Sequence, residues 1–131
     1  RGAVTYEILK CLPENGRLTC FEINPGFCQH LENINDPRLN IVNDDAANCE
    51  QHVENLDYIV SSMPLGLFDK AHRTKILDIS SKSKKNIQLQ YVPFLCKKLR
   101  VYFKDVRTKF VPLNFPPAFV YVCETSKRYH R

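Results

Sequence analysis

The chain has 131 residues, of which 44% are hydrophobic and 25% charged, a balance typical of one globular domain and unlike that of disordered or fibrous chains. No apolar run approaches the roughly 20 residues that span a bilayer, and no basic-then-apolar leader opens the chain, so the sequence predicts a cytoplasmic protein. The formal net charge of +5 suits a phosphate-rich partner, either nucleic acid or an anionic membrane surface. Six cysteines without a CxxC pair favour buried free thiols over disulfides or a zinc site.

Helix-like and strand-like segments alternate along most of the chain. The spacing of apolar residues predicts helices over 4–12, 25–34, 46–53, 67–79 and 94–103. Short apolar runs predict strands over 18–21, 39–42, 56–60 and 87–91, of which 56–60 has the composition of a strand covered on both faces. A tight turn joins two further strands, 106–113 and 118–123, as an antiparallel hairpin. This order predicts an α/β fold with a mostly parallel sheet that ends in the hairpin.

Acidic residues follow the first two predicted strands, at the sheet edge where ligands of such folds bind. Glu22 follows the first strand, and its two carboxylate oxygens suit the cis hydroxyls of a ribose. Asp45 follows the second strand and suits an exocyclic amine of adenine, while Ala46 leaves room for the ring. Two alternatives stay open. Glu22 could be an ordinary solvated acid in a loop, and Asp44 or Asp45 could cap the N-terminus of the following helix.

Small polar residues follow the third and fourth strands. The sequence "SSMPL", residues 61–65, places hydroxyl and carbonyl groups at the third strand end, although Ser and Pro are also common in an ordinary turn before a helix. Gln90 and Tyr91 follow at the fourth strand end, where a half-buried core aromatic is the alternative for Tyr91. Four strands that all carry polar residues at one edge predict a single ligand site.

The stretches "GAVT", "LTCFEINPGFCQHL", "RLNIVNDDAAN", "LDYIVSSMPL", "IQLQYVPF" and "FVPLNFPPAFVYVC" together resemble class I S-adenosylmethionine-dependent methyltransferases. The similarity is greatest to the bacterial phospholipid N-methyltransferases, which are related to the ribosomal RNA adenine dimethyltransferases. It implies a Rossmann-like three-layer sandwich in one domain over 1–131, with S-adenosyl-L-methionine as cofactor. In that family a central first strand ends in a glycine-rich turn, of which only Gly2 has a match here. The resemblance therefore implies an N-terminally truncated domain without the first strand.

The resemblance also assigns roles to residues at the strand ends. It implies that the ribose, adenine and methionine parts of the cofactor contact Gly2, Glu22, Ile23, Asp45, Ala46 and Ser61. It implies that methyl transfer takes place beside Ser61, Ser62, Met63, Pro64 and Tyr91. The acceptor side comprises Leu65, Gln90 and Tyr91, and no metal is implied.

Leu65 decides the predicted acceptor. Base-methylating relatives usually carry an aromatic at this position, which stacks on the flipped base, whereas leucine has no π-face. Phe68, three residues on, is assigned to the core of the following helix. The prediction is therefore methyl transfer to the amine of phosphatidylethanolamine at an anionic membrane surface, by a protein peripheral to the inner face of the membrane.

Three alternatives remain. The first is a ribosomal RNA adenine N6-dimethyltransferase with nucleic acid as its partner. The second is a nicotinamide-dependent oxidoreductase, in which Glu22 would also bind a ribose, but Asp45, the "SSMPL" stretch and the hairpin count against it. The third is a non-catalytic basic binding fragment that uses the cations between Lys82 and Lys104.

Overall fold

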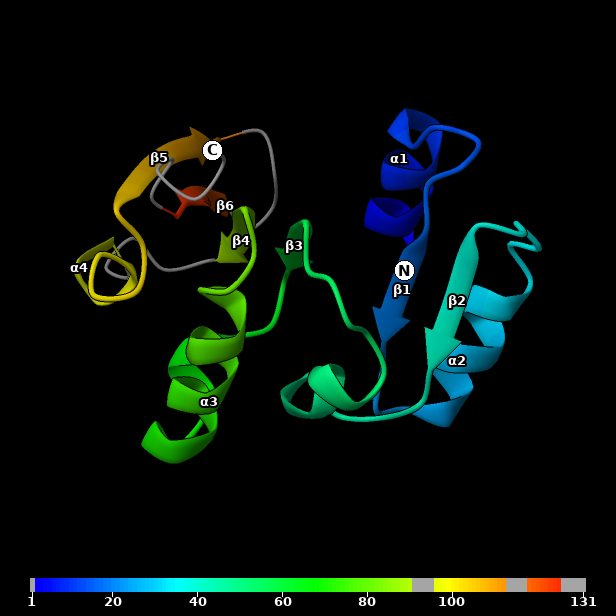
Figure 1. The fold of residues 1–131 in the computed structure, drawn as a ribbon, viewed down its shortest axis with the longest axis horizontal. Helices are drawn as coiled ribbons and strands as arrows, with labels where there is room; N and C mark the ends of the chain where they lie inside the picture. The colour runs from blue at the N-terminus through cyan, green and yellow to red at the C-terminus, as the bar shows by residue number, and fades with distance from the viewer. Residues whose placement is uncertain (1, 91–95, 113–117, 126–131) are drawn as a thin grey trace. The chain divides into compact units, whose positions relative to one another are not determined.

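In the computed structural model, residues 2–90, 96–112 and 118–125 are described, and the chain divides into two units (Figure 1). The N-terminal unit comprises Arg1–His52, and the C-terminal unit comprises Val53–Arg131. No helix within the described ranges has both the length and the apolar character needed to cross a membrane.

The N-terminal unit is built around two parallel strands. Its elements in chain order are α1 (Ala3–Cys11), β1 (Leu18–Phe21), α2 (Pro25–Glu32), β2 (Leu39–Val42) and the 3-10 helix η1 (Ala46–Gln51). β1 and β2 pair in register from Leu18 opposite Leu39 to Phe21 opposite Val42, so α2 is the crossover helix that a parallel pair requires. The buried apolar residues of this unit are Leu9, Cys28, Ala47 and Cys49.

Side-chain contacts fix the turns that enter α2 and β2. The Oδ1 atom of Asn24 accepts hydrogen bonds from the backbone N–H groups of Gly26 (2.9 Å) and Phe27 (3.3 Å), and thereby caps α2. Arg38 donates to both carboxylate oxygens of Asp36, at 3.0 and 2.7 Å, and to the carbonyl of Leu12. Arg38 therefore ties the end of α1 to the turn before β2.

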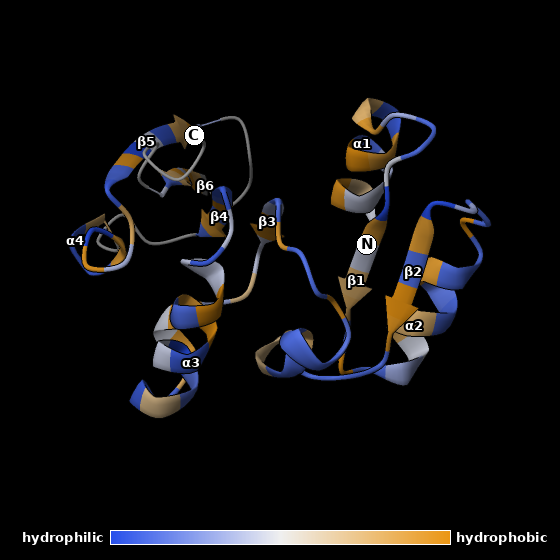
Figure 2. Ribbon diagram, in the orientation of Figure 1, coloured by the Kyte–Doolittle hydropathy of each residue, from blue (hydrophilic) through white to orange (hydrophobic). Residues whose placement is uncertain are grey.

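The C-terminal unit contains a four-stranded sheet with the order β3-β4-β6-β5. Its elements are β3 (Tyr58–Ser61), η2 (Leu65–Leu67), α3 (Lys70–Ser80), β4 (Lys85–Gln90), α4 (Cys96–Leu99), β5 (Asp105–Val111) and β6 (Ala118–Glu124). β3 is parallel to β4, and β6 is antiparallel to both β4 and β5. Hydropathy alternates along β5, as expected for a strand with two unlike faces (Figure 2). The predicted parallel pairs and closing antiparallel hairpin are confirmed.

The two faces of this sheet differ in burial. One face carries the buried residues Ser61, Asn86, Gln88, Gln90, Val106, Tyr121 and Cys123. On the other face, Tyr58 and Val60 of β3 are 70% and 42% exposed. The prediction that this strand is covered on both faces is therefore wrong in this structure.

β1 and β3 each have one open edge within the described ranges. β1 pairs with β2, and β3 pairs with β4, in two separate sheets. The predicted absence of a further central strand stays a prediction.

Several element boundaries differ from the predicted ones. α2 ends at Glu32, shortly before Asn35 adopts a left-handed φ of 53°. α3 begins at Lys70 because Asp69 caps it, its Oδ1 accepting the backbone N–H of His72 at 2.8 Å. In the segment 46–53 the helix is a 3-10 helix over Ala46–Gln51, and in the segment 94–103 the α-helix covers Cys96–Leu99. Tyr91, residues 94–95 and the hairpin turn 113–117 lie outside the described residues.

Candidate functional site

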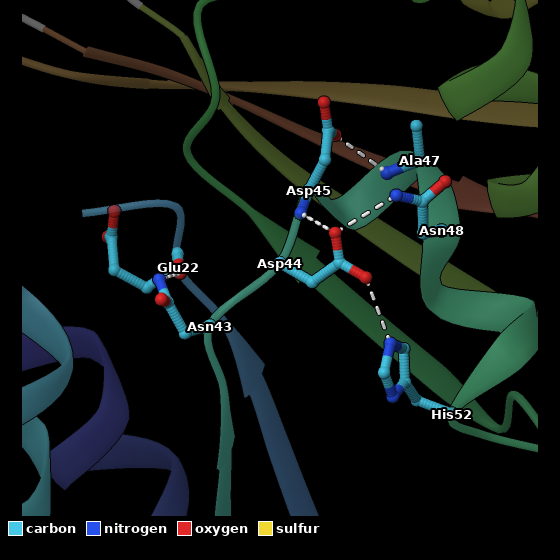
Figure 3. A network of polar contacts seen from close by, with 7 residues as sticks. All are labelled: Glu22, Asn43, Asp44, Asp45, Ala47, Asn48 and His52. Atoms are coloured by element: carbon cyan, nitrogen blue, oxygen red, sulfur yellow. Dashed lines mark hydrogen bonds and ion pairs between the residues drawn. The ribbon is translucent and has the colours of Figure 1, made fainter. Parts of the chain in front are cut away.

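The segments that follow β1 and β2 are joined at Glu22 (Figure 3). One carboxylate oxygen of Glu22 accepts the backbone N–H of Asn24 at 2.9 Å, which orients this half-exposed side chain. The side-chain amide of Asn43 donates to the backbone carbonyls of Glu22 (2.9 Å) and Ile23 (3.1 Å). Asn43 was not among the predicted site residues, and its position directly after β2 is the only sequence signal for this contact. Glu22 is therefore a positioned acid at a strand end and not only a solvated loop acid.

Asp44 and Asp45 have different roles. Asp45 accepts the backbone N–H of Ala47 at 2.9 Å and caps η1, so the N-cap alternative is confirmed for Asp45. Asp44 accepts the backbone N–H of Asp45 (2.7 Å) and the side-chain amide of Asn48 (2.9 Å), and its second oxygen lies 3.0 Å from Nε2 of His52 (Figure 3). The Asp44 network therefore ties the start of η1 to its end.

Two carboxylates of the N-terminal unit titrate well below the usual range. The amide of Asn48, the ring of His52 and the backbone of Asp45 stabilise charged Asp44 and lower its pKa to about 2. Hydrogen bonds from the side chain and backbone of Arg38 likewise lower the pKa of Asp36 to about 2. Both groups favour the charged form in the folded state.

Acidification is therefore expected to destabilise the N-terminal unit between about pH 4 and pH 2. Because the folded pKa values lie below the ordinary value of 3.8, the stabilisation is complete above pH 4 and is lost as the pH falls toward 2. Thermal unfolding followed by circular dichroism at a series of pH values measures this dependence. The Asp36→Asn/Asp44→Asn double variant should flatten it, and a wild-type curve no steeper than that of the double variant would contradict the assignment.

The end of β3 is held by side chains from β3 and β4. The buried hydroxyl of Ser61 accepts the backbone N–H of Met63 at 3.2 Å, which is the geometry of a local serine turn. From the end of β4, the side-chain amide of the buried Gln90 donates to the carbonyl of Met63 at 2.6 Å. Ser62 and Pro64 on either side are exposed. The backbone of Met63 is thus fixed from two strands.

The turn after this point differs from the sequence-based expectation. The Leu65 side chain is fully buried, so it offers no surface to an acceptor. Phe68 is half-buried, precedes α3, and stacks on His72 with ring centroids 4.7 Å apart and an interplanar angle of 15°. Arg73 donates to the carbonyls of Leu65 (3.5 Å) and Phe68 (3.2 Å) and holds this turn against α3. The assignment of Phe68 to a helix core is wrong.

Three amide side chains, Asn86, Gln88 and Gln90, share the buried face of β4. Gln88 donates to Asn86 at 2.8 Å, and within the described residues Nδ2 of Asn86 and Oε1 of Gln88 have no hydrogen-bond partner. The sequence reasoning missed this row, although "NIQLQ" carries a polar residue at every second position of a predicted strand.

The remaining predicted residues are placed as follows. Gly2 caps α1 with a left-handed φ of 86°, and its carbonyl accepts the backbone N–H of Tyr6 at 3.0 Å. Ile23 is exposed, Ala46 is half-buried at the start of η1, and Tyr91 lies outside the described residues. The structure thus brings Glu22, Ile23, Asp45 and Ala46 to the strand ends of one unit, and residues 61–64 and Gln90 to those of the other.

All six cysteines are free; Cys28, Cys49 and Cys123 are buried, whereas Cys11 is exposed. Burial is the main cause that raises the pKa of the Cys123 thiol to about 12. Among the side chains that the structure describes, no three of His, Cys, Asp or Glu gather as they would around a metal ion.

No protein-family model matches this chain, and no curated protein matches its sequence. Solved structures match its fold. A candidate rRNA methylase from Clostridium thermocellum matches with a TM-score of 0.63 and 15% identity over 95% of this chain and 82% of its own. An rRNA methylase from Streptococcus thermophilus matches with a TM-score of 0.56 and 15% identity, over 84% of this chain and 74% of its own. A candidate methyltransferase from Streptococcus mutans, in complex with SAH, matches with a TM-score of 0.54 and 10% identity, over 82% of this chain and 76% of its own.

At this level of identity the likeness shows the fold. The chain has the Rossmann-like α/β fold of these methyltransferases, as predicted. It spans 82% of the length of the Clostridium thermocellum structure and 53% of that of the similar 23S rRNA methyltransferase ErmE.

Proposed function

We propose that residues 1–131 form one S-adenosylmethionine-dependent methyltransferase domain that acts on an amine nitrogen of an RNA base, with adenine of ribosomal RNA as the first candidate. The observation that carries the proposal is the oriented carboxylate of Glu22 at the end of β1, beside the acid-capped turn after β2. The fold likeness to rRNA methylases and to a protein in complex with SAH supports it.

The strand ends of the N-terminal unit fit a nucleoside group. Each carboxylate oxygen can accept more than one hydrogen bond, so Glu22 can bind cis hydroxyls while one oxygen still accepts from Asn24. The exposed Ile23 offers an apolar contact beside it, and Asp45 with Ala46 would face the adenine. When bound there, the cofactor would supply an electrophilic methyl group on a sulfonium.

The end of β3 would position the acceptor. Ser61 and Gln90 fix the backbone of Met63, and the segment 61–64 contributes hydroxyl and carbonyl oxygens but no basic side chain. These oxygens can accept hydrogen bonds from an amine and aim its lone pair, so alignment is the main contribution that we assign to them. Tyr91 remains a proposed acceptor-side residue.

The acceptor is chosen from two observations. The preference for phosphatidylethanolamine depended on Leu65, and a fully buried Leu65 cannot contact either acceptor. The stacked rings of Phe68 and His72 lie three to seven residues further on, and a flat base can stack on such a pair. Together with the rRNA methylases among the similar structures, this favours RNA.

Isotope transfer from labelled S-adenosylmethionine tests the proposed function. The complete protein is given either undermethylated ribosomal RNA or vesicles that contain phosphatidylethanolamine. We expect label in RNA and none in lipid. Label in lipid alone would contradict the proposed acceptor and restore the phospholipid alternative.

A further inference from the structure

The charge of this chain is divided unevenly between its two units. The N-terminal unit has four Lys and Arg against eight Asp and Glu, a formal net charge of −4 over residues 1–52. The C-terminal unit has fifteen Lys and Arg against six Asp and Glu, a formal net charge of +9 over residues 53–131. The formal net charge of +5 for the whole chain is therefore the sum of an acidic unit and a strongly basic one.

Much of this charge lies in one short stretch, residues 96–109, which we call the basic segment. It comprises α4, the turn after α4 and most of β5. One acid, Asp105, stands in it against six exposed cations: Lys97, Lys98, Arg100, Lys104, Arg107 and Lys109. Arg107 is the one cation of the six that pairs with an acid within the described ranges, with its Nε 3.1 Å from Asp105.

Buried residues hold the basic segment in place. Leu99, Phe103 and Val106 lie in the core of the C-terminal unit. The backbone N–H of Phe103 donates to the carbonyl of Leu99 at 2.9 Å, and that of Lys104 donates to Glu124 of β6 at 3.1 Å. The backbone that carries these cations is therefore held by buried side chains and hydrogen bonds. Fixed like charges repel one another, so the segment does not gain folding stability from them.

The segment ends beside an exposed aromatic. Phe110 is 55% exposed, and its ring centroid lies 5.0 Å from that of Phe119 on the neighbouring strand. Lys109 and Arg107 precede it on the other face of β5, about 7 Å apart along the strand. β5 therefore carries regularly spaced cations on one face, which suit the phosphates of a polyanion. Its other face carries the Phe110 ring, on which a flat base can stack. A membrane-binding element would instead present a long amphipathic helix, whereas α4 has four residues.

We infer that the basic segment is an RNA-docking surface that binds phosphates of the substrate away from the reacting base. This inference rests on the proposed RNA acceptor. Each lysine that contacts a phosphate releases counterions on binding, so binding through this surface weakens as salt rises.

Two double variants, Lys97→Gln/Lys98→Gln and Lys104→Gln/Lys109→Gln, test the inference in the complete protein. The Lys70→Gln/Lys75→Gln variant of α3 is the matched control, because it removes two exposed lysines from the same unit. Affinity for an unmethylated ribosomal RNA stem-loop is measured over a series of salt concentrations. Each test variant should lower the slope of log affinity against log salt by about 1.5, and the control should leave it unchanged. Equal loss in the control would overturn the placement of the surface.

Two further measurements separate this inference from the proposed function and from a membrane role. S-adenosylmethionine affinity should be the same in all variants, since these lysines lie outside the proposed cofactor residues. Binding to phosphatidylglycerol vesicles that falls in the test variants while RNA binding does not would overturn RNA as the partner. If RNA binds through the segment but receives no methyl group, the proposed function fails while the docking surface stands.

Discussion

Replacing Glu22 with alanine is expected to weaken S-adenosylmethionine binding by at least about tenfold. Each charge-assisted hydrogen bond from a ribose hydroxyl contributes roughly 1.5 to 3 kcal/mol, and about 1.4 kcal/mol corresponds to a factor of ten. Titration calorimetry on the complete protein measures the change. Glu22→Gln is the more conservative variant, because it keeps an oxygen to accept the backbone N–H of Asn24.

Glu32→Ala is the matched control for this result. Glu32 is an exposed acid at the end of α2 in the same unit, outside the strand-end network. It should leave cofactor affinity unchanged. Unchanged affinity in Glu22→Ala as well would remove Glu22 from the cofactor site.

Replacing Gln90 with leucine should slow methyl transfer more than it weakens cofactor binding. The change removes the donor to the Met63 carbonyl and leaves the segment after β3 without its link to β4. The Met63 carbonyl still accepts the backbone N–H of Leu65, so the variant loses one of its two hydrogen bonds. One such bond contributes roughly 0.5 to 1.5 kcal/mol, and we expect a fall in rate of about 2- to 12-fold. Single-turnover transfer rates and cofactor titrations measure the two effects separately.

Gln88→Leu is the control for Gln90. Gln88 lies two residues earlier on the same buried face, and its side chain donates to Asn86 instead of the β3 end. Both variants replace a buried amide with an apolar side chain, so thermal unfolding reports any shared effect on stability. An equal loss of rate in both variants would show that Gln90 acts through stability and not through Met63.

The elements that were predicted best are those with local signals at both ends. β1 and β2 have the predicted bounds because each short apolar run is flanked by turn residues, such as Gly16 before β1 and the Asp36-Pro37 pair before β2. The start of α3 was placed too early, since Leu65 and Leu67 continue its apolar spacing but belong to a 3-10 turn.

The helix predicted over 94–103 was overestimated for a related reason. Leu99 and Phe103 have helical spacing, yet Val101 and Tyr102 have low helix propensity, and the backbone from Arg100 to Phe103 forms a turn that leads into β5. Apolar spacing alone does not distinguish a continuous helix from a short helix followed by a turn, because both conformations bury Leu99 and Phe103.

The candidate site was predicted as a set of strand ends but not as a set of contacts. Asp45 and Gln90 follow directly from the order of strands along the chain. The clamp by Asn43 and the contact between Gln90 and Met63 depend on the lateral positions of neighbouring strands, which no local pattern records. The predicted phospholipid acceptor depended on the residue type at Leu65. The burial of Leu65 depends on the direction of its side chain in a short turn, which no local pattern records.

Nucleoside mass spectrometry tests the central claim most directly. Undermethylated ribosomal RNA is incubated with the complete protein and S-adenosylmethionine, digested to nucleosides and examined for methyl groups on base amines. We expect methylated adenosine with the wild-type protein and little with Glu22→Ala. Binding of S-adenosylmethionine without any methylated nucleoside, while phosphatidylethanolamine becomes methylated, would contradict it.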